Sequence, residues 1–191
     1  LRKGGYVTLE ALSRLRHPTL GPVAPEVFIG IAEKSDQIAR LGLLQMRRVC
    51  RFLKEHRELM EQIQNVKINL EVINRYEINT FNTAEETAAF LENYQLENCY
   101  VHLDTFHMMI DECDPVQAVH RCAGKLGYFH VADNSRRYPG SGQIDFSRIL
   151  SALKEIGYEG YLSVECFPEP TPEEAAGRAI SYLRALAASA D

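Results

Sequence analysis

The chain alternates between short apolar runs and segments that carry helix-start signals, and this alternation restricts the fold more than any other feature. The helix starts are a capping box at Thr83–Glu86, an Asp-Pro pair at Asp114 and an isolated Asp145 before apolar residues with helical spacing. Strands that alternate with helices in this way pair in parallel and are covered by helices. Four such strands are predicted, at residues 66–73, 100–103, 127–131 and 161–164.

Two α/β architectures fit this alternation, a doubly wound sheet and a (β/α)8 TIM barrel. No glycine-rich phosphate-binding motif follows any predicted strand, so a nucleotide-binding sheet has no support. Polar residues gather at the carboxyl ends of the strands, which is where barrel enzymes build their sites. We therefore predict a single TIM-barrel domain across residues 1–191.

This barrel is expected to be incomplete at its N-terminal side. A full barrel needs about 250 residues, whereas the chain has 191. The first 60 residues contain one strand-like run, Val27–Ile31, among closely spaced prolines and glycines. Clear βα units begin at about residue 60, which predicts that N-terminal strands are missing or gapped.

Each predicted strand of the second part presents an acidic residue or a histidine at its end. Any one of these residues alone could be a paired core residue. Four at equivalent strand ends predict a shared ion, because unpaired buried charge is costly. Three carboxylates and one imidazole suit Mn²⁺, Mg²⁺ or Co²⁺ better than a structural Zn²⁺. The predicted metal ligands are Glu71, Asp104, His130 and Glu165.

Charge and composition exclude several classes of partner. The net charge of −5 gives no electrostatic reason to expect nucleic acid as a partner. No apolar run approaches the roughly 20 residues of a membrane span, so no membrane partner is expected. The five cysteines lack CxxC spacing and are odd in number, which predicts reduced thiols and a cytoplasmic location.

Four segments of this part of the chain form a characteristic set: Leu70–Glu77, Leu103–Met108, His130–Arg136 with Pro139–Gly142, and Tyr161–Glu165. They resemble motifs of the ketose 3-epimerases related to D-tagatose 3-epimerase, which belong to the xylose isomerase-like TIM barrels. The segments occur in the family's order, and the match extends over roughly residues 66 to 187. The resemblance implies an isomerase of carbohydrate metabolism that acts on a small-molecule sugar and that forms a homo-oligomer.

The resemblance also implies roles for individual residues. The four predicted metal ligands match the family's ligands, with Mn²⁺ favoured and Mg²⁺ or Co²⁺ as alternatives. Glu71 and Glu165 match the two carboxylates that exchange the C3 proton of a ketose through a cis-enediolate. Three residues match those that contact the sugar near its carbonyl end: Glu77, His107 and Arg136. Arg137, beside the last of these, is expected to face solvent.

Three alternative functions stay open at this point. A hydroxypyruvate isomerase-like or other aldose–ketose isomerase would use the same metal on the same barrel. A DNA-repair endonuclease of the AP endonuclease type would need several metals and a basic groove, which fits poorly with six histidines and an acidic chain. A sugar-binding protein without catalysis would be expected to lack one of the two glutamates, yet both are present.

Overall fold

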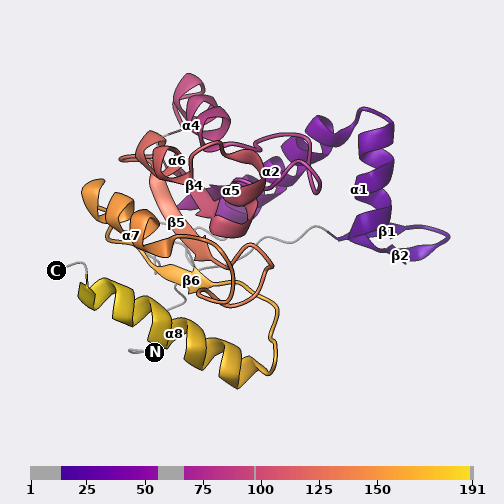
Figure 1. Ribbon diagram of the computed structural model, residues 1–191. Helices are drawn as coiled ribbons and strands as arrows, with labels where there is room; N and C mark the ends of the chain where they lie inside the picture. Colours follow the sequence, from indigo (N-terminus) through magenta and orange to yellow (C-terminus); the bar gives the residue numbers. More distant parts are fainter. Residues whose placement is uncertain (1–13, 56–66, 97, 190–191) are drawn as a thin grey trace. The chain divides into compact units, whose positions relative to one another are not determined.

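The computed structural model describes residues 14–55, 67–96 and 98–189, and the chain divides into two compact units, residues 1–66 and 67–191. In the first unit, strands β1 and β2 form an antiparallel hairpin, and helices α1 and α2 follow it (Figure 1). Their bounds are β1 Leu15–His17, β2 Gly21–Val23, α1 Pro25–Lys34 and α2 Ile38–Glu55.

The strand predicted at Val27–Ile31 is wrong, because these residues lie inside helix α1. A run of five apolar residues does not distinguish a buried strand from a helix. The decisive local signal is Pro25, which occupies the first turn of the helix, where its missing N–H has no cost. Burial follows the helical period: Phe28 and Ala32 are buried, while Val27 and Ile31 are exposed.

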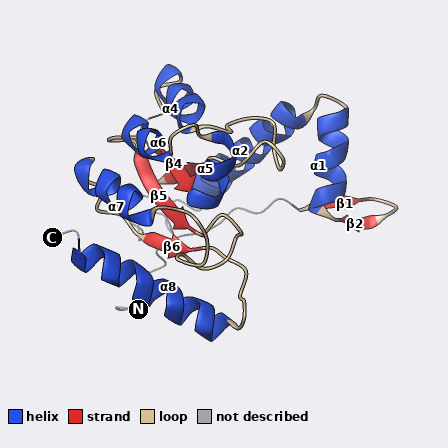
Figure 2. Cartoon of the chain, in the orientation of Figure 1, coloured by secondary structure: helices blue, strands red, loops and turns tan. Residues whose placement is uncertain are grey.

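The second unit contains four parallel strands whose order in the sheet follows their order in the chain (Figure 2). The helices also pack against one another in chain order: α4 contacts α6, α6 contacts α7, and α7 contacts α8. A doubly wound sheet reverses its strand order at a switch point, so this arrangement is that of a barrel wall. The strands are β3 Ile68–Glu71, β4 Cys99–Asp104, β5 Leu126–Val131 and β6 Leu162–Val164; the helices are α4 Ala84–Asn93, α5 Thr105–Asp111, α6 Pro115–Arg121, α7 Phe146–Glu155 and α8 Pro172–Ser189.

The predicted helix starts are confirmed. The side chains of Thr83, Asp114 and Asp145 each accept a hydrogen bond from a backbone N–H in the first turn of the helix that follows. The short helix α5 was not predicted. It begins directly after β4 because Asp104 accepts a hydrogen bond from the backbone N–H of Phe106 at 2.8 Å.

The two faces of the sheet differ in chemistry because side chains alternate along each strand. On one face Val101, Leu103, Phe129 and Val131 are fully buried in the core against the helices. The intervening residues on the other face are polar. This second face carries Glu71 on β3, His102 and Asp104 on β4, and Tyr128 and His130 on β5.

The ladder between β4 and β5 is interrupted at Gly127. Val101 pairs with Leu126, and the next residue, His102, pairs with Tyr128, so Gly127 has no partner on β4. A Cβ at this position would collide with the side chains of Asn69 and Tyr100. Beyond the interruption, Asp104 pairs with His130, which places both side chains on the polar face.

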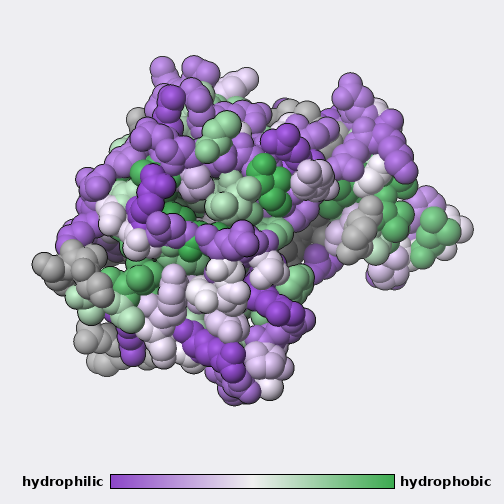
Figure 3. Space-filling view, in the orientation of Figure 1, coloured by the Kyte–Doolittle hydropathy of each residue, from purple (hydrophilic) through white to green (hydrophobic). Residues whose placement is uncertain are grey.

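Helix α8 begins with a polar first turn on the surface. Thr171 accepts a hydrogen bond from the backbone N–H of Glu174 at 3.2 Å and so caps the start of the helix. Glu174 also pairs with Arg178 one turn later, at 2.7 Å. This end of the helix is hydrophilic and lies at the bottom of Figure 3. Among the residues described, no helix is long and apolar enough to cross a membrane.

Candidate active site

The four predicted metal ligands lie together at the carboxyl ends of the strands. One donor atom from each of Glu71, Asp104, His130 and Glu165 lies within 4.8 Å of every other. Each residue lies on a different strand or directly follows one. Asp104 is fully buried, whereas the side chains of Glu71 and Glu165 are 29 % and 51 % exposed. The group therefore has a buried centre and two carboxylates that remain accessible.

His130 is the point on which the three carboxylates converge. Its Nδ1 lies 2.7 Å from Glu165 Oε2 and 3.7 Å from both Glu71 Oε1 and Asp104 Oδ2. None of these contacts has the geometry of a hydrogen bond, so Nδ1 is a buried ring nitrogen without a hydrogen-bond partner. Burial lowers the pKa of His130, but the surrounding carboxylates outweigh it and raise the pKa to about 11.

Arg136 contacts two of the four residues. Its guanidinium donates to Asp104 Oδ2 and to Glu165 Oε2, each at 2.7 Å, and lies over the ring of Phe106. Burial opposes ionisation of Asp104, yet His130 and Arg136 hold its pKa at about 2. The same two groups lower the pKa of Glu165.

The resemblance implies that Arg136 contacts the sugar near its carbonyl end, and this role stays a prediction. The structure places its guanidinium against two of the predicted metal ligands. Its backbone has φ of 57°, the left-handed region that ordinary residues adopt rarely. Arg137 is exposed, as expected, and pairs with Glu169 at 2.7 Å.

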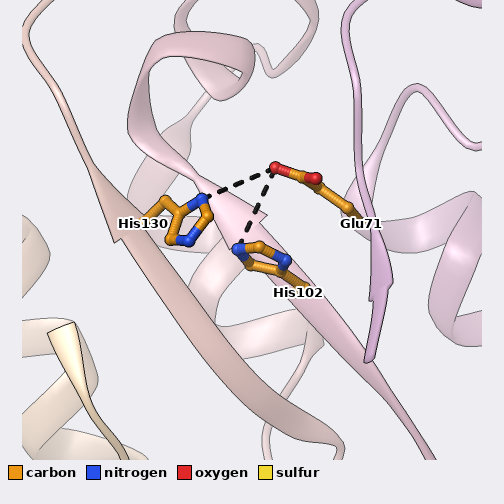
Figure 4. A group of neighbouring side chains, drawn as sticks. All are labelled: Glu71, His102 and His130. Carbon is orange, nitrogen blue, oxygen red and sulfur yellow. Dashed lines mark ion pairs between the residues drawn. The ribbon is translucent and has the colours of Figure 1, made fainter. Parts of the chain in front are cut away.

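His102 belongs to the same group and was missed by the sequence analysis. Figure 4 shows its imidazole and that of His130 directed toward Glu71, with Glu71 Oε1 lying 3.9 Å from His102 Nε2. Burial lowers the pKa of His102 to about 4, so the ring is neutral at pH 7. Its Nε2 is buried without a hydrogen-bond partner. The signal was present, because His102 lies two residues before Asp104 and so on the same face of β4.

The donor set fits a divalent cation. Two buried ring nitrogens lack proper hydrogen bonds, and three carboxylate oxygens lie around one of them. Concentrated negative charge that favours a proton on His130 also favours a metal ion at the same place. Carboxylates with imidazole are ligands that Mn²⁺, Mg²⁺ and Co²⁺ accept.

The remaining predicted residues lie in the segments that follow β3 and β4. His107 is in the first turn of α5 and is almost fully buried. Its Nδ1 lies 3.9 Å from Glu77 Oε1, so the structure brings these two together. Asn74, which the sequence analysis did not single out, lies between them and donates a hydrogen bond to Glu77 Oε1 at 2.8 Å.

A buried carboxylate organises the loop that follows β5. Asp133 has no exposed surface, and its oxygens accept hydrogen bonds from the backbone N–H groups of Asn134, Gly140 and Ile144, at 2.9, 3.0 and 3.2 Å. Its backbone carbonyl also accepts from the N–H of Arg136. The loop that carries Arg136 is therefore held from within by Asp133.

A model of the xylose isomerase-like TIM barrels matches residues 10–186 of the chain. The chain belongs to this family. The predicted TIM-barrel fold class and the resemblance to ketose 3-epimerases are thereby confirmed.

Named relatives are about two fifths identical to this chain over the segments that align. An L-ribulose 3-epimerase of Mesorhizobium japonicum is 42 % identical over 121 residues, which are 63 % of this chain and 41 % of that protein. A ketose 3-epimerase of Arthrobacter globiformis is 40 % identical over 53 % of this chain and 35 % of its own length. The chain thus spans about two fifths of the length of the curated relatives it matches.

Solved structures give the same result. A D-psicose 3-epimerase crystallised in the presence of D-fructose superposes with a TM-score of 0.60 and 30 % identity, over 63 % of this chain and 49 % of that one. A 3-keto-D-glucoside 4-epimerase from E. coli superposes with a TM-score of 0.64 and 25 % identity, over 89 % of this chain and 59 % of its own. Both are sugar epimerases, which differ in the carbon they invert.

Proposed function

We propose that this protein is a divalent-metal-dependent ketose 3-epimerase. The observation that carries the proposal is the position of two accessible glutamates at opposite edges of one charged group. Glu71 ends the first strand of the four-stranded sheet, and Glu165 follows the last. Asp104 and His130 lie between them on the two middle strands. Similarity to L-ribulose 3-epimerase and D-psicose 3-epimerase supports the same reaction class.

Glu71, Asp104, His130 and Glu165 would hold the metal ion, for which Mn²⁺ is the first candidate. When bound, the ion withdraws electrons from the ketone oxygen and makes the neighbouring C3 proton more acidic. Asp104 is fully buried and tied to Arg136, so it serves as an anchor. The two glutamates keep exposed oxygens that can face a substrate.

The chemical step needs a base on one face of C3 and an acid on the other. One glutamate accepts the C3 proton, and the other returns a proton to the opposite face, which inverts the carbon. Because the two carboxylates exchange roles, the reaction proceeds in both directions. Arg136, His107 and Glu77 would hold oxygens near the carbonyl end of the sugar. Arg136 contacts Glu165, and His107 lies beside Glu77.

The proposal is tested by isotope exchange in the protein loaded with Mn²⁺. The unmodified protein should epimerise at least one ketose from a set of D-psicose, D-fructose, D-tagatose and L-ribulose, with deuterium from solvent entering C3. Glu71→Gln and Glu165→Gln keep the shape of the side chain and remove the base, so each should lower the rate at least 100-fold. Glu173→Gln, a change at an exposed residue of α8, is the matched control.

Two results would contradict the proposal. Exchange at the unmodified rate in either glutamine variant would remove that glutamate from the acid–base role. Turnover of hydroxypyruvate without epimerisation of any ketose would instead assign the site to an aldose–ketose isomerase. Calorimetry with Mn²⁺, Mg²⁺ and Co²⁺ identifies the preferred metal, and Asp104→Asn should abolish tight binding of that metal.

We also propose a cytoplasmic location and a homo-oligomeric assembly. The location rests on the thiols: Cys113, Cys122 and Cys166 form no disulfide among the described residues. The assembly rests on the family resemblance alone. Sedimentation of the purified protein measures it directly.

A further inference from the structure

Asn74 links two of the residues proposed to contact the sugar, although no role has been given to it so far. It lies in the loop after β3 and is 1 % exposed. Its amide nitrogen donates to Glu77 Oε1 at 2.8 Å and lies 2.7 Å from His107 Nδ1. Its amide oxygen accepts from the backbone N–H of Tyr76 at 2.9 Å. The Asn74 amide therefore makes three polar contacts, all of them to other residues of this chain.

The orientation of the Asn74 amide follows from its neighbours. The atom that faces Glu77 must be the NH₂ group, because a carboxylate is only an acceptor. The atom that faces the N–H of Tyr76 must then be the oxygen. A flipped amide would place oxygen against carboxylate and NH₂ against N–H, which would lose both hydrogen bonds. The chemistry of two partners thus decides the orientation without reference to His107.

This orientation dictates the protonation state of His107. The second N–H of the Asn74 amide is directed at His107 Nδ1, so Nδ1 must be the unprotonated acceptor. The ring proton is then on Nε2. Nε2 has no hydrogen-bond partner among the described residues, and it is not one of their fully buried unpaired atoms. It is therefore free to donate to a ligand.

We propose that Asn74 is a positioning residue that holds His107 as a neutral imidazole with its proton on Nε2, ready to donate a hydrogen bond to an oxygen of the sugar. The donation to sugar rests on the proposed function, while the tautomer does not. The arrangement has a physical purpose, because Glu77 Oε1 lies 3.9 Å from His107 Nδ1 and its charge favours a second proton on the ring. An Asn at Nδ1 opposes that second proton and leaves a donor of fixed direction.

The tautomer can be measured directly in the full chain labelled with ¹⁵N-histidine. Long-range ¹H–¹⁵N correlation spectra distinguish a protonated ring nitrogen from an unprotonated one. Loss of one set of peaks in His107→Gln assigns the signals. We expect Nδ1 of His107 to be unprotonated and Nε2 to carry the proton at neutral pH. A protonated Nδ1 in the unmodified protein would overturn the proposal.

Asn74→Asp tests whether Asn74 is the cause. Aspartate keeps the acceptor for Tyr76 but presents a carboxylate to His107, so the proton should move to Nδ1. Because this carboxylate also faces Glu77, the same change is made together with Glu77→Gln to remove repulsion between like charges. If both variants fold and the His107 signals stay as in the unmodified protein, Asn74 does not control the tautomer and the proposal fails.

Asn82→Asp is the matched control. Asn82 lies in the same loop and donates to the backbone carbonyls of Ile73 and Ile78, at 2.7 and 3.0 Å, without contacting His107. The change should lower the melting temperature and leave the His107 signals where they are. A shift of the tautomer in Asn82→Asp would show that general loosening of the loop suffices, which would contradict a specific role for Asn74.

Kinetics with the ketose that the protein turns over fastest test the link to substrate. Asn74→Asp should lower kcat/KM about tenfold or more, which corresponds to the loss of one hydrogen bond of about 1.4 kcal/mol. Metal affinity should stay unchanged. A moved tautomer with unchanged kcat/KM would overturn the donor role. If no ketose is epimerised, the proposed function fails, while the spectra still decide the tautomer independently.

Discussion

Two loops frame the candidate site, and each is organised around one buried polar side chain of a different kind. The loop after β3 is built on Asn74, and the loop after β5 on Asp133. Asn74 both donates and accepts, so it joins side chains to one another. Asp133 only accepts, so it gathers backbone N–H groups. An amide therefore sets the state of a neighbouring imidazole, whereas a carboxylate shapes the course of the chain.

The largest effect is expected at Asp133. Asp133→Ala leaves the backbone N–H groups of Gly140 and Ile144 without their acceptor inside the loop. Each unpaired group costs about 1–3 kcal/mol, so the free energy of unfolding should fall by about 3 kcal/mol. Urea titration measures the change, and limited proteolysis should show new cleavage between residues 134 and 144.

Asp133→Asn sharpens the comparison between amide and carboxylate. The amide keeps one acceptor oxygen and turns its NH₂ toward a backbone N–H, so we expect an intermediate loss. If Asp133→Asn were as stable as the unmodified protein, an amide could organise this loop as well as a carboxylate does. The difference in side-chain chemistry would then not explain why the two loops are built differently.

The second effect concerns Arg136, which the Asp133 loop carries. Arg136→Ala removes two charge-assisted hydrogen bonds, to Asp104 and to Glu165. Such bonds are worth about 1.5–3 kcal/mol each, so kcat/KM for the ketose should fall about 100-fold. Metal content, measured by atomic emission, should not change.

Arg137→Ala is the control for that experiment. Arg137 is exposed and pairs only with Glu169, itself 54 % exposed, among its described neighbours, and exposed ion pairs contribute little. We expect activity within a factor of two of the unmodified protein, since no ion pair among the described residues joins Arg137 to the predicted metal ligands. A damaging Arg137→Ala with a silent Arg136→Ala would mean that the loop presents the other arginine to the substrate.

The smallest effect is expected at Asp145. Its carboxylate is exposed and accepts a hydrogen bond from a backbone N–H. Asp145→Ala removes the N-cap of α7 and should cost about 1 kcal/mol. The hydrogen bond from Ser147, with that from the N–H of Arg148, lowers the pKa of Asp145 below 3.8. A carboxyl group whose pKa is lowered in the folded state stabilises the fold fully at pH values above its ordinary pKa. The stabilisation by the Asp145 cap is therefore lost as the pH falls through the lowered pKa.

The pH dependence of unfolding checks this sign. The difference between Asp145→Ala and the unmodified protein should be constant from pH 7 to pH 5 and should shrink below about pH 4. A difference that grows in acid would contradict the cap. A loss at Asp145 as large as the loss at Asp133 would show that burial is not what separates the two carboxylates.

The parts of the fold that sequence could predict depend on local signals. The helix caps bond to backbone N–H groups within three residues of themselves, so the adjacent sequence predicts them. They are Thr83, Asp114 and Asp145. The positions of Glu71 and Asp104 at strand ends follow from alternating apolar residues. Helix α1 shows the limit of such local signals. The apolar run after Pro25 fits the period of a strand and that of a helix equally well until its packing neighbours are known.

The parts that sequence could not predict depend on contacts between distant residues. Asn74 contacts His107 across 33 residues, and Arg136 contacts Asp104 across 32. Nothing beside Asn74 in the chain indicates that its amide faces an imidazole. Nothing beside Arg136 indicates that its guanidinium meets both Asp104 and Glu165. Local patterns predict which residues end a strand, and only the folded loops determine which of them meet.

The unpaired Gly127 has a consequence for how this chain tolerates insertions and deletions. Leu126 pairs with Val101 before the extra residue and Tyr128 pairs with His102 after it, so the ladder needs no residue between them. Removing Gly127 would leave a regular ladder in which Asp104 still pairs with His130. Adding a side chain there would instead collide with Asn69 and Tyr100. At this position the strand pairing therefore tolerates the loss of the residue better than its replacement by a larger one.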